Sequence, residues 1–320
     1  MNLQWRHFTA ADAASVSELF RAVYGEHYVY PDLYLPAMIS QHNAQGDWYS
    51  ALALDGERVV GHSALCRDPQ DPGSAELALN AVHPDARGRG IATTLGQLLC
   101  GHARELGLDT LTIKQVSSYT HSQQLARTLG FQTTGLLLDY VSSPYGNAWR
   151  ESVVLGCQTL RPGHRPLPAL DWPAEYAQWA ESLTRHFGSG SAAPAPLDTP
   201  MQVRRHGERV EVTLERVEAA SLAQIALLPG NWLIHVRLRL DQGFDEALAR
   251  LAPAGYVFAG LAPAPGAGWY ALLERGFDAR PLTLRCPIAQ TLHQNAQLPP
   301  LSGLPPRRRP EVGAAAIRSC

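Results

Sequence analysis

The sequence lacks the features that mark membrane or nucleic-acid-binding proteins. No stretch approaches the roughly 18 consecutive apolar residues of a membrane-spanning helix, and the N-terminus lacks the charged and then apolar layout of a signal peptide. Basic and acidic residues nearly balance, at 27 Lys and Arg against 29 Asp and Glu. No strong charge of one sign favours nucleic acid or a membrane surface as a partner. We therefore expect a cytoplasmic protein that acts on a small molecule.

Cysteine is scarce as well. The five cysteines, Cys66, Cys100, Cys157, Cys286 and Cys320, are odd in number and show neither a CxxC pair nor the spacing of a metal site. This usage fits reduced, mostly structural thiols, and we predict no metal. The chain has 320 residues, of which 45% are hydrophobic, and this is enough for two domains of ordinary size.

The stretch from Glu76 to Gly107 carries the clearest pattern. Its apolar run Leu77–Val82 predicts a buried strand, which His83-Pro84-Asp85 ends because proline cannot continue a ladder. Apolar residues then recur at helical spacing from Ile91 onward, and Gly107 supplies the expected stop. Between strand and helix lies a basic glycine turn. Such a turn leaves unpaired backbone N–H groups at the positive end of the helix dipole, which is a site for phosphate.

The turn itself, Arg87-Gly88-Arg89-Gly90-Ile91-Ala92, resembles the Gln/Arg-x-x-Gly-x-Gly/Ala signature of the GCN5-related N-acetyltransferase (GNAT) superfamily. In that family the loop holds the pyrophosphate of acetyl-coenzyme A (acetyl-CoA). The resemblance implies that acetyl-CoA is the co-substrate, that residues 87–92 bind it, and that Ala81 and Val82 lie beside the thioester, with a main-chain contact to its oxygen near Val82.

The order of elements extends the resemblance over residues 1 to about 160. Strands, a hairpin around Asp55-Gly56, the central strand–turn–helix, and a helix ending in Gly130-Phe131 follow one another as in GNAT proteins. The predicted fold class is therefore α+β, a GNAT fold with a mixed, mostly antiparallel central sheet flanked by helices. We assign residues 1–160 to the N-acetyltransferase domain.

The second half is predicted to be a smaller, degenerate GNAT-like domain. Leu125-Ala126-Arg127, Gly130-Phe131 and Gly135-Leu136 are echoed by Leu248-Ala249-Arg250, Gly255-Tyr256 and Gly260-Leu261. No counterpart of the glycine turn occurs between 200 and 250, so no coenzyme is expected there. The boundaries are 161–200 for a helix and small-residue linker, 201–290 for the accessory domain and 291–320 for a Pro-rich disordered tail.

Acetyl transfer to an amine requires a base, because an alkyl amine with a pKa of roughly 10.4 is protonated at neutral pH. Glu76 lies where many GNAT enzymes carry a glutamate base, which often acts through water. The alternative interpretation, a glutamate at the end of a strand that faces solvent and has no catalytic role, is nearly as well supported. His83 is a second candidate, and Asn80 and His121 are weaker ones.

Proton delivery to the leaving thiolate is where the sequence departs from the family. Many GNAT enzymes place a tyrosine five residues before the Phe of the Gly-Phe pair, and Ala126 stands there. Tyr119, Ser122 or Tyr140 could replace it, or water could supply the proton.

The acceptor is expected to be a primary amine of a small molecule or peptide, bound by a monomer or homodimer. Four tyrosines in the loop-like stretch 24–34 could line its site or could cap the core: Tyr24, Tyr28, Tyr30 and Tyr34. Two functions remain open at this stage. One is an acetyl-CoA-dependent N-acetyltransferase, and the other is a catalytically inactive acetyl-CoA-binding regulatory or scaffolding protein.

Overall fold

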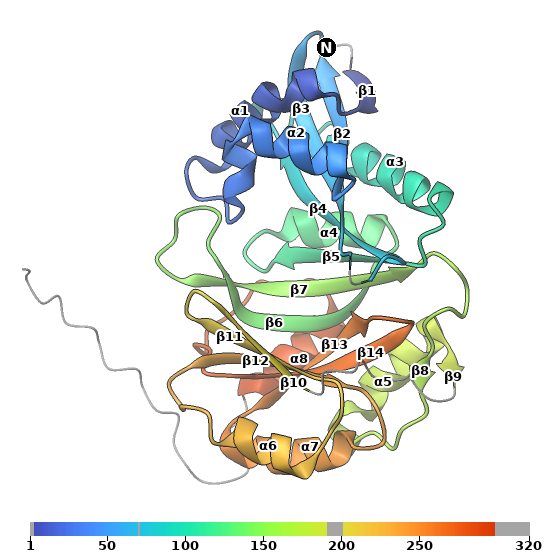
Figure 1. Cartoon of the computed structure of the whole chain (residues 1–320), viewed down its shortest axis with the longest axis vertical. Helices are drawn as coiled ribbons and strands as arrows, with labels where there is room; N and C mark the ends of the chain where they lie inside the picture. Colours follow the sequence, from blue (N-terminus) through green and yellow to red (C-terminus); the bar gives the residue numbers. More distant parts are fainter. Residues whose placement is uncertain (1–2, 70, 191–200, 298–320) are drawn as a thin grey trace, which may run out of the picture.

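A computed structural model describes residues 3–69, 71–190 and 201–297. These residues contain a twisted sheet of twelve strands in the order β1-β2-β3-β4-β5-β7-β6-β13-β14-β12-β11-β10 (Figure 1). Within it, β4 pairs with β5 and β11 with β12 in parallel, and the other neighbours are antiparallel. The mixed, mostly antiparallel sheet expected from the sequence is confirmed.

The N-terminal half contributes seven of the strands and four helices. The strands are β1 (Leu3–His7), β2 (Trp48–Asp55), β3 (Arg58–Arg67), β4 (Ser74–Val82), β5 (Thr110–Val116), β6 (Gln132–Ser142) and β7 (Arg150–Thr159). The helices are α1 (Ala13–Tyr24), α2 (Pro36–Gln45), α3 (Ile91–Glu105) and α4 (Thr120–Thr128). Short 3-10 turns stand at 10–12, 31–34 and 84–86.

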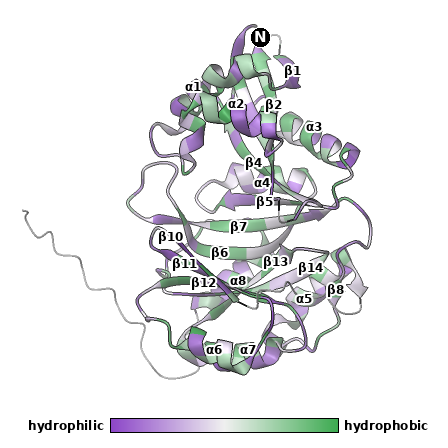
Figure 2. Cartoon of the chain, viewed as in Figure 1, coloured by the Kyte–Doolittle hydropathy of each residue, from purple (hydrophilic) through white to green (hydrophobic). Residues whose placement is uncertain are grey.

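The C-terminal half continues the same sheet. It contains β8 (Leu167–Pro168), α5 (Ala174–Phe187), β9 (Ser189–Gly190), β10 (Met201–His206), β11 (Arg209–Leu214), α6 (Ala219–Ala226), β12 (Leu233–Arg239), α7 (Phe244–Leu251), β13 (Val257–Ala264), β14 (Gly268–Arg275) and α8 (Pro287–Gln297). Among the described residues, the strands β8 and β9 pair only with each other. Helices α3, α6 and α7 each carry hydrophobic and hydrophilic stripes (Figure 2), as helices that bury one face against a sheet do.

Two of the core clusters in the N-terminal half lie on opposite faces of its strands. One gathers under α3, where Ile91, Leu95 and Leu99 are buried. The other gathers under α1 and α2 around Phe20 and Ile39. The sheet is therefore covered on both faces here. This agrees with the apolar sequence of β4, because a strand that is apolar on both sides must be buried on both faces.

The strand order of the C-terminal half repeats that of the N-terminal half. The run β3-β4-β5-β7-β6 has its counterpart in β10-β11-β12-β14-β13, with α3 matched by α6 and α4 by α7. The two runs meet where β6 lies beside β13, and the paired residues there are Gly135 and Gly260. These are the two glycines at the centre of the sequence echo. A Cβ on Gly260 would lie 2.3 Å from the Thr134 carbonyl oxygen, so this contact requires glycine.

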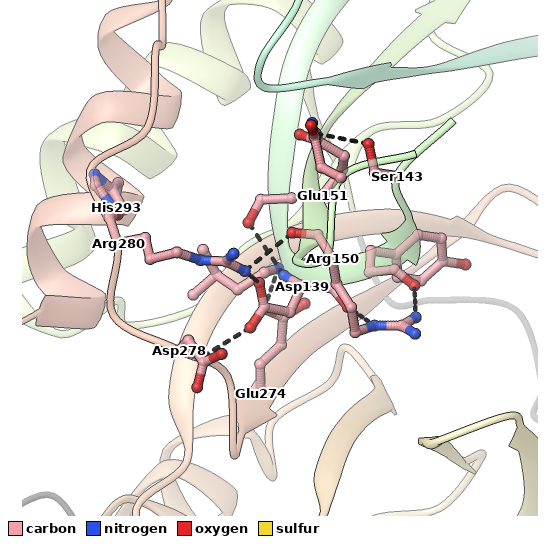
Figure 3. A network of polar contacts seen from close by, with 12 residues as sticks. Asp139, Ser143, Arg150, Glu151, Glu274, Asp278, Arg280 and His293 are labelled. Carbon is pink, nitrogen blue, oxygen red and sulfur yellow. Dashed lines mark hydrogen bonds and ion pairs between the residues drawn. The ribbon is translucent and has the colours of Figure 1, made fainter. Parts of the chain in front are cut away.

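A segment after β14 fastens the two halves together. The Asp139 carboxylate, on β6, accepts hydrogen bonds from the Asp278 backbone N–H at 2.7 Å and from the Arg280 guanidinium (Figure 3). Arg280 also donates to the Arg150 carbonyl oxygen at 3.0 Å. Gln123 of α4 bonds the same segment further along, accepting from the Arg285 N–H at 2.9 Å.

Several elements of the C-terminal half differ from expectation. Helix α8 ends at Gln297, so the prediction of a disordered tail from 291 is wrong for residues 291–297, while 298–320 lie outside the described residues. Leu292 of this helix is buried against the core, which explains its order despite the polar sequence. The sequence pattern predicts strands at 209–217 and 231–240, and β11 and β12 occupy those places in shorter form. The sequence pattern missed β10 and α6.

Candidate active site

The strands β4 and β5 separate soon after they meet. Only Ser74–Glu76 pair with Thr110–Thr112, although β4 continues to Val82 and β5 to Val116. The register of β3 and β4 shifts in the same region, and Leu79 has a φ of 54°, which marks a bulge. Because the bulge twists β4 away from β5, the backbone groups of the second part of β4 face a gap in the sheet.

His62 supports this bulge from β3. Its Nδ1 lies 2.8 Å from the Leu79 carbonyl oxygen, and the ring is buried. Burial lowers the pKa of His62 to about 4, so the imidazole is neutral at pH 7 and donates its single N–H to that oxygen. This histidine was not among the candidates predicted from the sequence.

Backbone N–H groups of β4 point into the gap. The His83 N–H donates to the Val60 carbonyl oxygen at 2.9 Å and therefore points toward β3. Backbone groups alternate in direction along a strand, so the Val82 N–H points the opposite way, toward the gap. The Val82 carbonyl oxygen accepts from Arg87 Nε at 3.4 Å, which draws that arginine back over the end of β4.

The glycine turn lies at the same end of the gap. Gly88 and Gly90 have φ values of 76° and 73°, and a Cβ at either would meet nothing within 4 Å, so the space above them is open. Gly90 is the N-cap of α3, and no side chain caps the helix. The first N–H groups of α3 are thus available to an anion. Ile91 holds the helix start in place against Gly61, where a Cβ would lie 2.4 Å from its side chain.

Glu76 lies at the point where β4 and β5 part. Its Oε2 is 2.6 Å from Lys114 Nζ on β5, and the two side chains are 22% and 29% exposed. Burial alone lowers the pKa of Lys114, but the charge of Glu76 and the nearby Tyr140 and Tyr30 outweigh it, so the net pKa is raised. The lysine stays charged and holds the glutamate in one place.

Three tyrosines from separate elements lie near one another beside the second part of β4. The Tyr24 hydroxyl, at the end of α1, donates to the Asn80 carbonyl oxygen at 2.8 Å. The Tyr145 ring, from the β6–β7 loop, lies 5.9 Å from the Tyr24 ring and 6.2 Å from the Tyr119 ring. Burial is the main cause that raises the pKa of Tyr145 to about 12. Its hydroxyl therefore carries a proton at neutral pH and is able to donate a hydrogen bond.

The other tyrosines of the 24–34 stretch have different surroundings: Tyr30 is exposed, whereas Tyr28 and Tyr34 stabilise the loop. Tyr30 is 46% exposed, and the charge of Glu76 is the main cause that raises its pKa to about 12. Tyr34 accepts a hydrogen bond from the Tyr28 N–H at 2.9 Å and lies under the Arg21 guanidinium. These contacts brace the loop that carries Tyr30.

The remaining candidates have partners that tie them to the fold. The Ser122 hydroxyl donates to the Tyr119 carbonyl oxygen at 2.7 Å, at the start of α4. His83 lies 2.6 Å from the Arg58 guanidinium, and Asn80 accepts from the Ser63 hydroxyl at 2.6 Å. His121 stacks near Tyr119, with ring centroids 5.1 Å apart.

Two side chains of the site were missed by sequence reasoning. Lys114 belongs to a predicted strand, but its pairing with Glu76 depends on where two strands stop running together. Tyr145 belongs to an irregular loop, and the only sequence signal for it was the aromatic character of the stretch from Pro144 to Trp149.

A surface hollow of about 370 Å³ between β1 and α3, near His102, lies apart from this site. Across the part of the chain that the structure describes, no group of three His, Cys, Asp or Glu side chains could hold a metal, and no helix is long and apolar enough to cross a membrane.

Residues 13–131 match the sequence model of the Acetyltransferase (GNAT) family. The match covers 119 of the 320 residues, all within the N-terminal half of the chain. A search of curated proteins found no match.

Solved structures similar to the chain include an N-acetyltransferase from Staphylococcus aureus Mu50, with 19% identity and a TM-score of 0.44 over 50% of this chain and 100% of that one. A phosphinothricin acetyltransferase from Sinorhizobium meliloti, solved with acetyl-CoA, has 23% identity and a TM-score of 0.43 over 50% of this chain and 89% of that one. A putative acetyltransferase from Salmonella typhimurium, also solved with acetyl-CoA, has 19% identity and a TM-score of 0.42 over 50% and 94% of the two chains.

Proposed function

We propose that this protein is an acetyl-CoA-dependent N-acetyltransferase with one active site, in the gap between β4 and β5. The observation that carries the proposal is the early separation of these strands directly beside an uncapped, glycine-lined helix start. A gap bordered by free backbone groups suits the amide-containing arm of coenzyme A, and the turn suits its diphosphate. Residues 87–92 would hold the diphosphate, and Val82 would offer its N–H to the thioester oxygen.

The coenzyme supplies the acetyl group as a reactive thioester. In the proposed reaction the nitrogen of the acceptor amine forms a bond to the carbonyl carbon, and the carbon–sulfur bond breaks. Glu76, held by Lys114, takes a proton from the amine directly or through water. The Val82 N–H stabilises negative charge on the carbonyl oxygen. Tyr119, whose ring centroid lies 6.2 Å from that of Tyr145, would return a proton to the thiolate.

We also propose that residues 201–290 are a degenerate second copy of the fold that has lost coenzyme binding. The repeated strand order supports the shared ancestry of the two halves. The loss is supported by β11 and β12, which pair over six residues from Arg209 to Leu214 and leave no gap. The N-cap of α6 is Glu218, an acid that would repel phosphate where α3 has Gly90.

The proposal is tested by following free thiol released from acetyl-CoA in the presence of a panel of amines, with mass spectrometry of the acetylated product. We expect product with at least one amine class and a large loss of rate in the Glu76→Gln variant. Ala126, where many GNAT enzymes have a tyrosine, favours the alternative of an inactive coenzyme-binding protein. Thermal stabilisation by acetyl-CoA without thiol release from any amine class would establish that alternative.

A further inference from the structure

One row of paired residues crosses the whole join between the two halves. Lys114 of β5 pairs with Leu155 of β7, and Leu155 pairs with Gly135 of β6. Beyond the join, Gly260 of β13 pairs with Leu272 of β14, and Leu272 pairs with Arg237 of β12. Paired residues in a sheet project to the same face, so Lys114 and Arg237 occupy equivalent positions on one face.

The acids beside these two cations are equivalent as well. Glu76 is paired with Thr112, two residues before Lys114, and Glu211 is paired with His235, two residues before Arg237. Glu211 and Arg237 are in contact, with 3.8 Å between Oε1 and Nη2. The second half has therefore kept the acid–cation pair of the first half while its strands closed the coenzyme gap.

The two pairs share a neighbour in Tyr140, which links them across the join. Lys114 Nζ lies 5.9 Å from the centroid of the Tyr140 ring, and the Tyr140 hydroxyl donates to Glu211 Oε1 at 3.3 Å. Tyr140 is also among the groups that raise the pKa of Lys114 and of Arg237. A chain of contacts thus runs from Glu76 through Lys114, Tyr140 and Glu211 to Arg237 in the second half.

The second pair differs from the first in the charge that it exposes. The Glu211 side chain is 13% exposed and is also held by Arg209 at 2.9 Å and His206 at 3.5 Å. Arg237 is 35% exposed, its contact with Glu211 is long, and it is also hydrogen-bonded to Tyr140. Two arginines share one carboxylate here, so the group offered to solvent on this face is a guanidinium. A guanidinium recognises carboxylate and phosphate through paired N–H donors.

We propose that Arg237 binds an anionic group, a carboxylate or a phosphate, on the acceptor whose amine is placed at Glu76. This inference rests on the proposed function and narrows the acceptor to amines that also carry a negative charge. The second half then acts as the specificity wall of the active site. Tyr30, exposed beside Glu76, and Tyr140 would flank the chain that joins amine and anion.

The test compares acceptors that differ only in the anion. ω-Amino acids of increasing chain length are assayed against their amides, and O-phosphoethanolamine is assayed against ethanolamine, in wild type, Arg237→Gln and Arg237→Lys. We expect kcat/KM in wild type to favour one charged member of a pair. The Gln variant should lose about 10- to 100-fold with that acceptor and little with its neutral partner, and the Lys variant should recover part of the loss. Arg250→Gln, on the exposed surface of α7, is the matched control.

Binding of the same probes, measured by calorimetry with coenzyme A present, separates this inference from the proposed function. If no amine is acetylated but charged probes bind and Arg237→Gln weakens them, the function fails and the anion site stands. If amines are acetylated but Arg237→Gln affects charged and neutral acceptors equally, the anion site is refuted and the function stands. Equal binding of charged and neutral probes to the wild type also refutes it.

Discussion

Replacing Gly90 with glutamate tests the coenzyme loop. Gly90 has a φ of 73° and open space above its Cα, so the new side chain meets no protein atom within 4 Å of its Cβ. The left-handed backbone costs about 1–2 kcal/mol of stability for any residue other than glycine. A carboxylate about 4 Å from a bound phosphate adds a repulsion of about 1 kcal/mol in water and about 4 kcal/mol near a protein surface. We therefore expect the Kd of acetyl-CoA to rise by about fivefold to a thousandfold.

Gly56 in the β2–β3 hairpin provides the matched control. It has a φ of 62° and nothing within 4 Å of its would-be Cβ, so Gly56→Glu carries the same backbone strain outside residues 87–92. Gly90→Gln separates the bulk of the side chain from its charge. Calorimetric titration with acetyl-CoA is the assay, at low salt so that repulsion is not screened. If Gly90→Glu binds as tightly as Gly56→Glu, the assignment of the loop is wrong.

Three further perturbations probe the base, the join and the N-terminal turn. Glu76→Gln should lower kcat by about 100- to 10,000-fold with an unchanged Kd for acetyl-CoA. The control Glu57→Gln, in the exposed hairpin, should change neither quantity. If Glu76→Gln retains the wild-type kcat, Glu76 is not the base. Asp139→Asn should lower the free energy of unfolding in urea by about 2 kcal/mol, since it leaves a partly buried arginine unpaired, and an unchanged midpoint would contradict the role given to the segment after β14. The salt bridge to Arg6 lowers the pKa of Asp12 to about 2 from 3.8, so its stabilisation is present above pH 4 and is lost as the pH falls through 2. Asp12→Asn should accordingly cost about 1–2 kcal/mol at pH 7, after allowance for the exposed arginine, and progressively less as the pH falls toward and below 2. A cost that does not change with pH would exclude the charge as its cause.

Local sequence signals were enough to predict the central unit of the fold. The apolar run to Val82, the glycine turn and the helical spacing from Ile91 are encoded within thirty-two residues, from Glu76 to Gly107, and β4 and α3 lie where the pattern put them. The hairpin around Gly56 was predicted for the same reason, because a turn residue with a left-handed conformation has few alternatives to glycine.

Contacts between distant segments could not be predicted in this way. Lys114 meets Glu76 only because β4 and β5 stop pairing after three residues, and the bulge that separates them depends on His62 of a third strand. Arg237 lies on the same face of the sheet as Lys114 because of the register of six strands. Helix α8 is polar over much of its length, and its order depends on packing against strands far away in the chain. Periodicity reports which face of an element is buried, but not what covers it.

The central claim is that acetyl-CoA lies between β4 and β5, and a crystal structure of the protein with acetyl-CoA tests it most directly. We predict one coenzyme per chain, with its diphosphate against Gly88 and Gly90 and its amide-containing arm bonded to the backbone of β4 near Val82. A coenzyme bound elsewhere, a second coenzyme against β11 and β12, or β4 and β5 paired to their ends would contradict the account.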